Sequence, residues 1–247
     1  MGLSMGSTFP GATGLSEISI YDWPGADGAA GGSPHVHTAS TEAYVVLAGT
    51  GRLETLDSRG FTSTPLVPGV VLWFTPGTVH RAINDSGDLK ILVVMQNAGL
   101  PEHGDAVMTF PPEHLTDPAT YRRAAALEHT DADSGLDAAE EAARRRRDLA
   151  LEGYLALKDA VLRSGPAALA GFHAAAARLA SAKAETWAGL LAAGAARQAE
   201  VTRQQLVSLD TAESIYLGRA RTTMGKRENR RIYGMCGRIQ GWELSDN

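Results

Sequence analysis

The sequence predicts an α+β protein, in which a mainly β barrel is followed by an all-α helical bundle. Short apolar runs alternate with glycine and proline turns in the first part of the chain, a pattern typical of barrels and sandwiches. Alanine and other helix formers at helical spacing dominate the second part. We expect five segments, namely a flexible N-terminus, the barrel, a linker, the helical domain and a C-terminal tail, at residues 1–16, 17–115, 116–136, 137–222 and 223–247.

Six strands are expected in the barrel. Glycine turns at 49–51 and 58–60 and the Pro76-Gly77 turn separate them. Alternation within the second strand places Glu42, Tyr44 and Val46 on one face. The six strands are predicted at Ile18–Trp23, Ala43–Leu47, Arg52–Leu56, Val70–Phe74, His80–Asn84 and Leu89–Met95.

The helical part is predicted to hold three or four helices. A long helix ends at Ser164-Gly165, and Pro166 suits the first turn of the next one. The segment from Asp131 to Gly135 is rich in Asp, Ser and Gly, and this composition predicts a linker. The four arginines at 144–147 circle a helix axis instead of lining one face, and Glu140 and Glu141 lie one turn back to pair with them. We therefore interpret this run as a solvated helix.

Composition bounds the possible partners. The chain has 247 residues, 44% of them hydrophobic and 21% charged, with a net charge of −5 and a pI of about 5.8. This acidic balance gives no electrostatic reason to bind nucleic acid or a membrane surface, so neither is expected. The single cysteine, Cys236, excludes an internal disulfide and fits a reducing compartment. The first ten residues lack the basic and apolar regions of a secretion signal, and we predict a cytoplasmic location.

Three histidines and one carboxylate are spaced like a metal site. His35 and His37 are two residues apart, so both side chains point to one face of a strand. Glu42 begins the next apolar run, and His80 follows the Pro76-Gly77 turn. Such a mixed nitrogen and oxygen ligand set suits one divalent transition metal, either Fe, Ni, Cu, Zn or Mn.

The spacing also resembles a known family. His35-x-His37-x4-Glu42-x6-Gly49 is similar to the first motif of the cupins, whose fold is a double-stranded β-helix barrel. Gly69-x5-Thr75-x-Gly77-x2-His80-x3-Asn84 is similar to the second motif, with Thr75 where the family usually has proline. The resemblance covers about residues 15–100. It implies that His35, His37, Glu42 and His80 bind one metal ion inside the barrel.

Several functions remain open at this point. The first is a non-haem metal-dependent oxygenase acting on a small organic substrate, with Glu42 and Tyr44 as the catalytic candidates. The second is a non-oxidative isomerase or lyase acting on a sugar or a small acid, and the third is a binding module without enzymatic activity. The apolar residues expected at the pocket favour the oxygenase; they are Tyr44, Val46, Val71, Trp73 and Phe74. Tyr44 could equally be a core aromatic residue, and a homodimer is left open.

Overall fold

The computed structural model describes residues 9–127 and 135–246. Residues 1–8 of the predicted N-terminal segment and residues 128–134 of the predicted linker lie outside it. The remaining part of the 116–136 segment holds a short helix, α1 (Pro118–Ala125). The Asp117 side chain caps this helix by accepting hydrogen bonds from the Ala119 and Thr120 amides, and Pro118 occupies its first turn.

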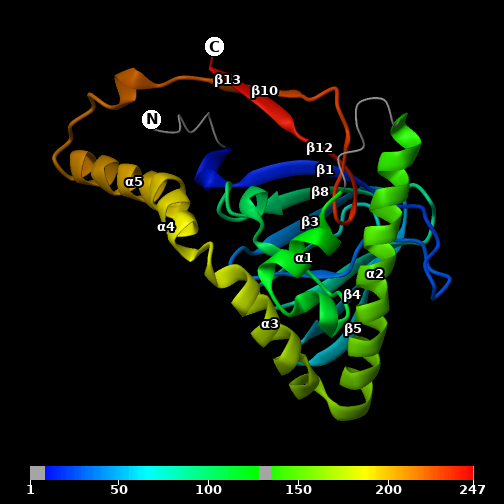
Figure 1. The fold of residues 1–247 in the computed structure, drawn as a ribbon. Coiled ribbons are helices and arrows are strands. Elements are labelled where there is room, and N and C mark those ends of the chain that lie inside the picture. The colour runs from blue at the N-terminus through cyan, green and yellow to red at the C-terminus, as the bar shows by residue number, and fades with distance from the viewer. Residues whose placement is uncertain (1–8, 128–134, 247) are drawn as a thin grey trace.

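Two antiparallel sheets face each other and form the barrel (Figure 1). The first sheet has the strand order β11-β12-β1-β8-β3-β6, and the second has the order β5-β4-β7-β2-β9. The bounds in the first sheet are Ile232–Tyr233, Gly237–Gln240, Gly14–Ile20, Lys90–Met95, Glu42–Ala48 and Val71–Phe74. Those in the second are Gly60–Leu66, Gly51–Asp57, Val79–Asn84, His35–His37 and Ala106–Met108.

The barrel core lies between these sheets, and strand alternation selects the residues that enter it. On β3 the side chains of Glu42, Tyr44 and Val46 are buried, as the sequence predicted. On β6 two residues predicted to line the pocket point outward instead: Val71 is 57% exposed and Trp73 is 69% exposed. The expectation that these two line the pocket is wrong; they lie on the outer face of the sheet, and Phe74 points inward.

Some strands gave no sequence signal that we recognised. Pro65 lies within β5, where it is tolerated because β5 is the edge of its sheet. The three-residue strand β9 is formed by a segment flanked by prolines. The segment expected as a C-terminal tail contributes β12, which pairs with β1 through Ile18 and Ile239, so the two ends of the chain meet in one sheet. A separate two-stranded sheet joins β10 (Thr223–Arg227) and β13 (Trp242–Asp246).

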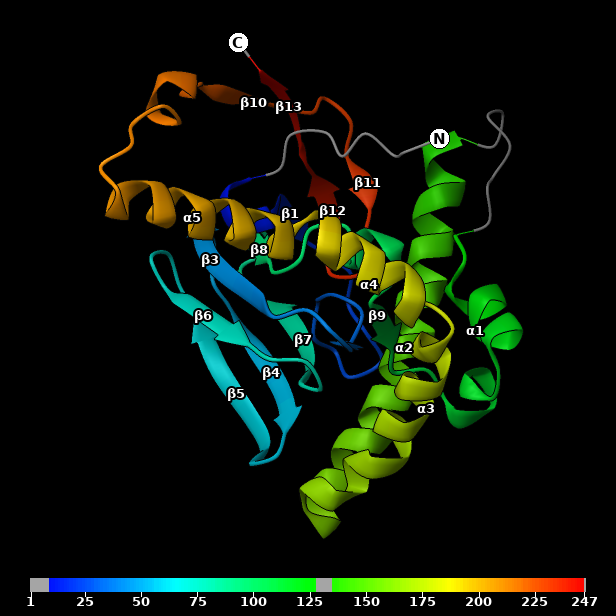
Figure 2. The ribbon, with the colours of Figure 1, turned by 90° about the vertical axis from the view of Figure 1, so that its left-hand side faces the viewer.

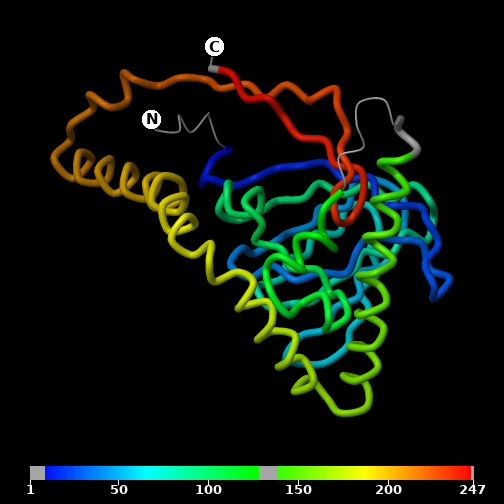
Figure 3. The backbone as a smooth tube through the Cα atoms, viewed as in Figure 1, coloured from blue at the N-terminus to red at the C-terminus, as the bar shows by residue number. Residues whose placement is uncertain are grey.

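The helical part follows the barrel, and the predicted fold class is confirmed. Its helices are α2 (Gly135–Ser164), α3 (Ala170–Ser181), α4 (Ala184–Ala193) and α5 (Ala195–Asp210). Figure 2 shows α3, α4 and α5 following one another along the molecule, and in Figure 3 the chain leaves α5 and crosses to β10 and β13.

These helices share a core with the barrel. One apolar cluster joins Val36, Leu56 and Val79 on the outer face of the second sheet to Tyr154 of α2 and Phe172 of α3. None of the residues of α5 is buried. The alanine-rich helices α2 and α3 are therefore packed against the barrel.

Helix α2 is held on the barrel by close backbone approach and by buried polar contacts. A Cβ atom on Gly153 would lie 2.0 Å from the Thr109 carbonyl oxygen, so a larger residue would push the helix away. Glu54 of β4 accepts hydrogen bonds from the Tyr154 hydroxyl at 3.0 Å and from the Lys158 ammonium at 2.9 Å. Glu54 and Tyr154 are buried, so these hydrogen bonds offset the free-energy cost of removing the Glu54 carboxylate from water.

The four arginines at 144–147 differ in their surroundings. Arg144 and Arg145 form the predicted ion pairs with Glu140 and Glu141. Arg147 is buried and donates to the backbone carbonyls of Trp23, Pro24 and Gly31, which corrects the prediction of a fully solvated run. Within the described ranges, none of the helices combines the length and apolar character needed to cross a membrane.

Candidate metal centre

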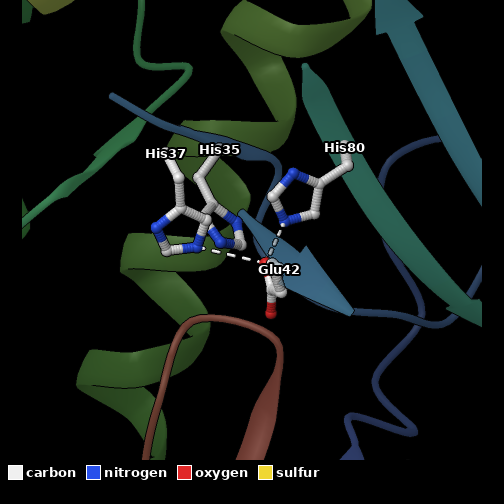
Figure 4. Close-up of side chains that lie close together, drawn as sticks. All are labelled: His35, His37, Glu42 and His80. Atoms are coloured by element: carbon white, nitrogen blue, oxygen red, sulfur yellow. Dashed lines mark ion pairs between the residues drawn. The ribbon is translucent and has the colours of Figure 1, made fainter. Parts of the chain in front are cut away.

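Three histidines and one glutamate converge inside the barrel. One ligand atom from each of His35, His37, Glu42 and His80 lies within 4.8 Å of the others, and all four side chains are buried. In Figure 4 the three imidazole rings lie on one side of the Glu42 carboxylate, and dashed lines join it to His37 and His80. Nε2 of His37 is 3.1 Å from Glu42 Oε2, and Nε2 of His80 is 3.2 Å from the same oxygen.

Strand pairing explains this convergence. His35 of β2 is the register partner of His80 of β7, so the two side chains leave neighbouring strands toward the same interior. Glu42 comes from β3 in the facing sheet, where Phe74 and Met95 are its partners on either side. The Glu42 carboxylate therefore lies between apolar neighbours on its own sheet and points toward the imidazoles of the facing sheet.

Each imidazole is oriented through its Nδ1 atom. Nδ1 of His35 bonds to the Ser33 carbonyl oxygen at 2.9 Å, and Nδ1 of His80 bonds to that of Thr78 at 3.1 Å. Nδ1 of His37 faces a carboxylate oxygen of Asp105 at 3.3 Å. With Nδ1 donating in every case, Nε2 is the nitrogen left to bind a metal.

The residues fit a transition metal ion. Nε2 of His37 and Nε2 of His80 lie 3.1 Å and 3.2 Å from Glu42 Oε2, and one ligand atom from each of the four residues lies within 4.8 Å of the others. Atoms this close can be bound by one ion, since nitrogen and oxygen ligands lie about 2.0–2.2 Å from it. His80 Nε2 and Glu42 Oε2 have no well-formed hydrogen bond among the described residues, although they are 3.2 Å apart. Buried polar atoms without hydrogen bonds are expected where a metal is to bind.

Burial and neighbouring charges shift the pKa values of His35, His37 and Glu42. Burial, with the neighbouring His80 and His37, holds the pKa of His35 well below its usual range. Burial also acts to lower the pKa of His37, but the Glu42 and Asp105 carboxylates outweigh it and raise the pKa to about 9. The pKa of Glu42 falls despite burial, because His37 and His80 stabilise the carboxylate. Without a metal, a charged His37–Glu42 pair occupies the centre at neutral pH.

The family model of the cupin domain matches residues 24–95, the part of the chain that holds all four residues. Residues 24–95 are a cupin domain. This match agrees with the family that the two sequence motifs indicated.

Several solved structures are similar to part of the chain. One is an uncharacterized protein with a double-stranded β-helix domain from Klebsiella pneumoniae, at 18% identity and a TM-score of 0.26, covering 34% of this chain and 64% of its own. A nucleoside dehydratase from Streptomyces has 12% identity and a TM-score of 0.29, covering 38% and 66%. A TDP-fucose-3,4-ketoisomerase from Campylobacter jejuni has 18% identity and a TM-score of 0.28, covering 32% and 58%.

The chain thus spans about two thirds or less of the length of these proteins, and the similarity is too partial to assign their activities to it. No curated protein matches the sequence.

Asp105 supports the cupin centre, and the sequence analysis missed it. It follows Gly104 just before β9 and is fully buried. Besides facing His37, its carboxylate accepts hydrogen bonds from the amides of Thr38, Ala39 and Ser40. These donors, with His37, hold its pKa far below the usual range against the effect of burial. Nothing near Asp105 in sequence suggests this role, because β9 brings it to β2 across almost seventy residues.

Tyr44 and Cys236 lie beside the centre. The Tyr44 ring packs edge-on against Phe74, whose own ring centre is 4.2 Å from that of His80. The Tyr44 hydroxyl is 3.6 Å from the Cys236 sulfur, and burial raises the pKa of both groups. Both groups are therefore protonated at neutral pH. The C-terminal segment carries Cys236 into the barrel, which its local sequence did not indicate.

Access to the centre is narrow. His80 is 0% exposed and His37, the most exposed of the four, is 6% exposed. A cavity of about 400 Å³ borders His37 on the side of α3 and α4. His173 of α3, which the sequence left without a partner, lines this cavity and donates from Nε2 to the Gly77 carbonyl oxygen at 2.8 Å. His103 and His114 are not part of the centre, and His129 lies outside the described residues.

Proposed function

We propose that the cupin domain is a metal-dependent enzyme, a non-haem oxygenase acting on a small organic substrate. The observation that carries this proposal is the convergence of three imidazole nitrogens and one carboxylate oxygen at metal-ligand spacing. His35, His37, Glu42 and His80 would hold one divalent transition metal. When bound, a divalent ion supplies a Lewis acid, and a redox-active one also supplies a site for O2 chemistry.

The surroundings of the centre favour a mostly apolar substrate. Phe74 and Met95 flank Glu42, and Tyr44 lies on the same inward face. Among the described residues, the ion pairs of Glu42 are with His37 and His80, so its carboxylate is not paired with a lysine or an arginine. This environment supports the oxygenase over an isomerase acting on a phosphorylated sugar.

The chain's own residues have defined parts in this proposal. The Nδ1 hydrogen bonds keep the imidazoles oriented, and the Glu42 carboxylate would help to hold the ion or accept a hydrogen bond from a substrate hydroxyl beside His80. Burial excludes bulk water and so protects a reactive intermediate from hydrolysis. A catalytic role for Tyr44, a homodimer and a cytoplasmic location stay predictions.

Oxygen consumption tests the proposal. Purified protein is loaded with iron, nickel or copper and mixed with flavonols, diketones, thiols or aromatic acids, beside a matched His80→Ala protein. We expect substrate-dependent O2 uptake by the parent protein and none by the variant. Anaerobic turnover of a sugar or small acid would move the protein to the non-oxidative class. Failure to bind metal in any form would overturn the proposed enzyme.

A further inference from the structure

Helix α3 packs behind the strands that carry the three histidines of the centre. Val36 lies between the two histidines of β2, and Val79 comes directly before the histidine of β7. Because successive side chains of a strand point to opposite faces, both valines point away from the centre. The apolar cluster that contains them also contains Phe172 of α3. The helix therefore lies on the side of the sheet opposite to the imidazoles.

The turn before β7 contacts two of these histidines. The Gly77 amide donates a hydrogen bond to the His37 carbonyl oxygen at 3.0 Å. The next residue, Thr78, provides the carbonyl oxygen that accepts a hydrogen bond from Nδ1 of His80 at 3.1 Å. The conformation of this turn therefore affects both the backbone position of His37 and the orientation of the His80 ring.

Glycine makes this turn possible and also leaves it easily deformed. Gly77 has a φ of 90°, in the left-handed region that residues with a Cβ rarely adopt. The same lack of a Cβ gives glycine more backbone freedom than other residues have. A turn built on this residue needs contacts from outside the turn to keep one conformation.

His173 of α3 makes such a contact. Its side chain is half-buried and donates from Nε2 to the Gly77 carbonyl oxygen at 2.8 Å. Gly77 is thus bonded on both sides, through its amide to β2 and through its carbonyl to the helix. The position of the donor is fixed by the packing of α3, since Phe172, the preceding residue, is buried in the shared cluster.

We propose that His173 is a positioning residue for the metal centre. By holding the Gly77 carbonyl, it keeps the turn in the conformation in which Thr78 orients the His80 ring and Gly77 holds the His37 backbone. The helical part of the chain then acts on the centre without contributing a ligand. The inference rests on the proposed metal centre but not on the reaction performed there.

Three variants of the full-length protein test this role. His173→Leu removes the donor and keeps an apolar side chain of similar size. His173→Gln places an amide N–H near the position of the imidazole Nε2, so it can restore the bond to Gly77. Tyr154→Phe is the matched control, because it also removes a hydrogen bond from a helix to the barrel, but one that ends on Glu54 instead of the turn.

The first measurement uses metal-free protein. The Nδ1–H resonance of His80 in ¹H–¹⁵N spectra, assigned by its absence from a His80→Ala protein, reports the bond to the Thr78 carbonyl. We expect its exchange with water to be about fivefold faster in His173→Leu, the effect of losing one hydrogen bond on a local opening equilibrium. His173→Gln and Tyr154→Phe should exchange at the rate of the parent.

The second measurement uses protein loaded with Co²⁺, whose visible absorption depends on the geometry of its ligands. We expect the bands to shift in His173→Leu alone and Co²⁺ affinity to fall about three- to tenfold. This loss is smaller than the 10–100-fold typical of a partner bonded directly to a ligand, because the turn lies between His173 and His80.

Two results would overturn the inference. One is a His80 Nδ1–H exchange rate in His173→Leu equal to that of the parent, even if the variant unfolds more easily. The other is an equal acceleration in Tyr154→Phe, which would assign the effect to a general loosening of the helices. A parent protein that binds no metal would overturn the proposed enzyme, and the exchange rates in metal-free protein would still decide whether His173 positions the imidazole.

Discussion

The candidate metal centre and the cavity beside α3 and α4 differ in the side chains that line them. At the centre, each Nδ1 atom has an acceptor, and the Nε2 atoms and the Glu42 carboxylate are left facing one another. The cavity beside α3 and α4 borders His37, but most of its helical wall consists of alanines. The comparison teaches that a site for an ion needs polar side chains held in fixed orientations, whereas a cavity arises where small side chains leave space unfilled.

The largest effect is expected from removing a ligand of the centre. His80→Ala deletes a nitrogen that no neighbour can replace, so we expect metal affinity to fall by more than about a hundredfold. Elemental analysis after dialysis against the metal measures it. Circular dichroism should show a folded barrel in the variant. His103→Ala, at an exposed position, is the control, and equal metal content in the two variants would refute the ligand assignment.

The pH dependence of metal binding should be nearly as large. The pKa of His37 is raised to about 9 in the metal-free protein, so at pH 7 a metal must displace its proton. Affinity for Zn²⁺ should therefore rise about tenfold per pH unit from pH 7 and level off above pH 9. Titration in weak buffer should release about one proton per ion at pH 7.5. An affinity that is flat across this range would mean that His37 is neutral before binding.

Asp105→Asn probes the orientation of His37. The amide keeps the size of the side chain but removes the negative charge that faces Nδ1, so we expect metal affinity to fall about 10–100-fold. The pKa of His37 should also fall in the metal-free variant, which titration by NMR can follow. Asp57→Asn is the control, because Asp57 contacts Arg59 and is not among the residues of the centre. This change should alter neither the metal affinity nor the pKa of His37.

The smallest effect on metal binding is expected from Tyr44→Phe. The hydroxyl contacts the Cys236 sulfur, which is a weak acceptor, and it is not among the ligand atoms. We expect metal affinity within about twofold of the parent and a change in unfolding free energy of about 1 kcal/mol or less. Isothermal titration and thermal unfolding measure the two. A large loss of metal would place Tyr44 in the centre itself.

The four residues of the candidate metal centre could be predicted from the sequence, because they lie in short segments with characteristic spacing. The His-x-His pair and Glu42 occupy one face of short strands, and alternation alone brings each set inward. The Val71 and Trp73 assignments failed for a related reason, because a continuous apolar run does not reveal which alternate residues face the core. The barrel strands from β3 to β8, apart from β5, were likewise located by turns and apolar runs.

The sequence by itself determined the order of a barrel and helices and the four side chains that meet in the barrel, because these follow from periodicity and from residue types at fixed spacing. Tertiary structure alone decided that Asp105 faces His37, that the C-terminal segment brings Cys236 beside Tyr44, and that His173 of α3 donates a hydrogen bond to the Gly77 carbonyl oxygen. These three features join segments far apart in the chain. Their positions depend on which strands pair and how the helices pack on the outer sheet face, and no local pattern encodes such long-range contacts.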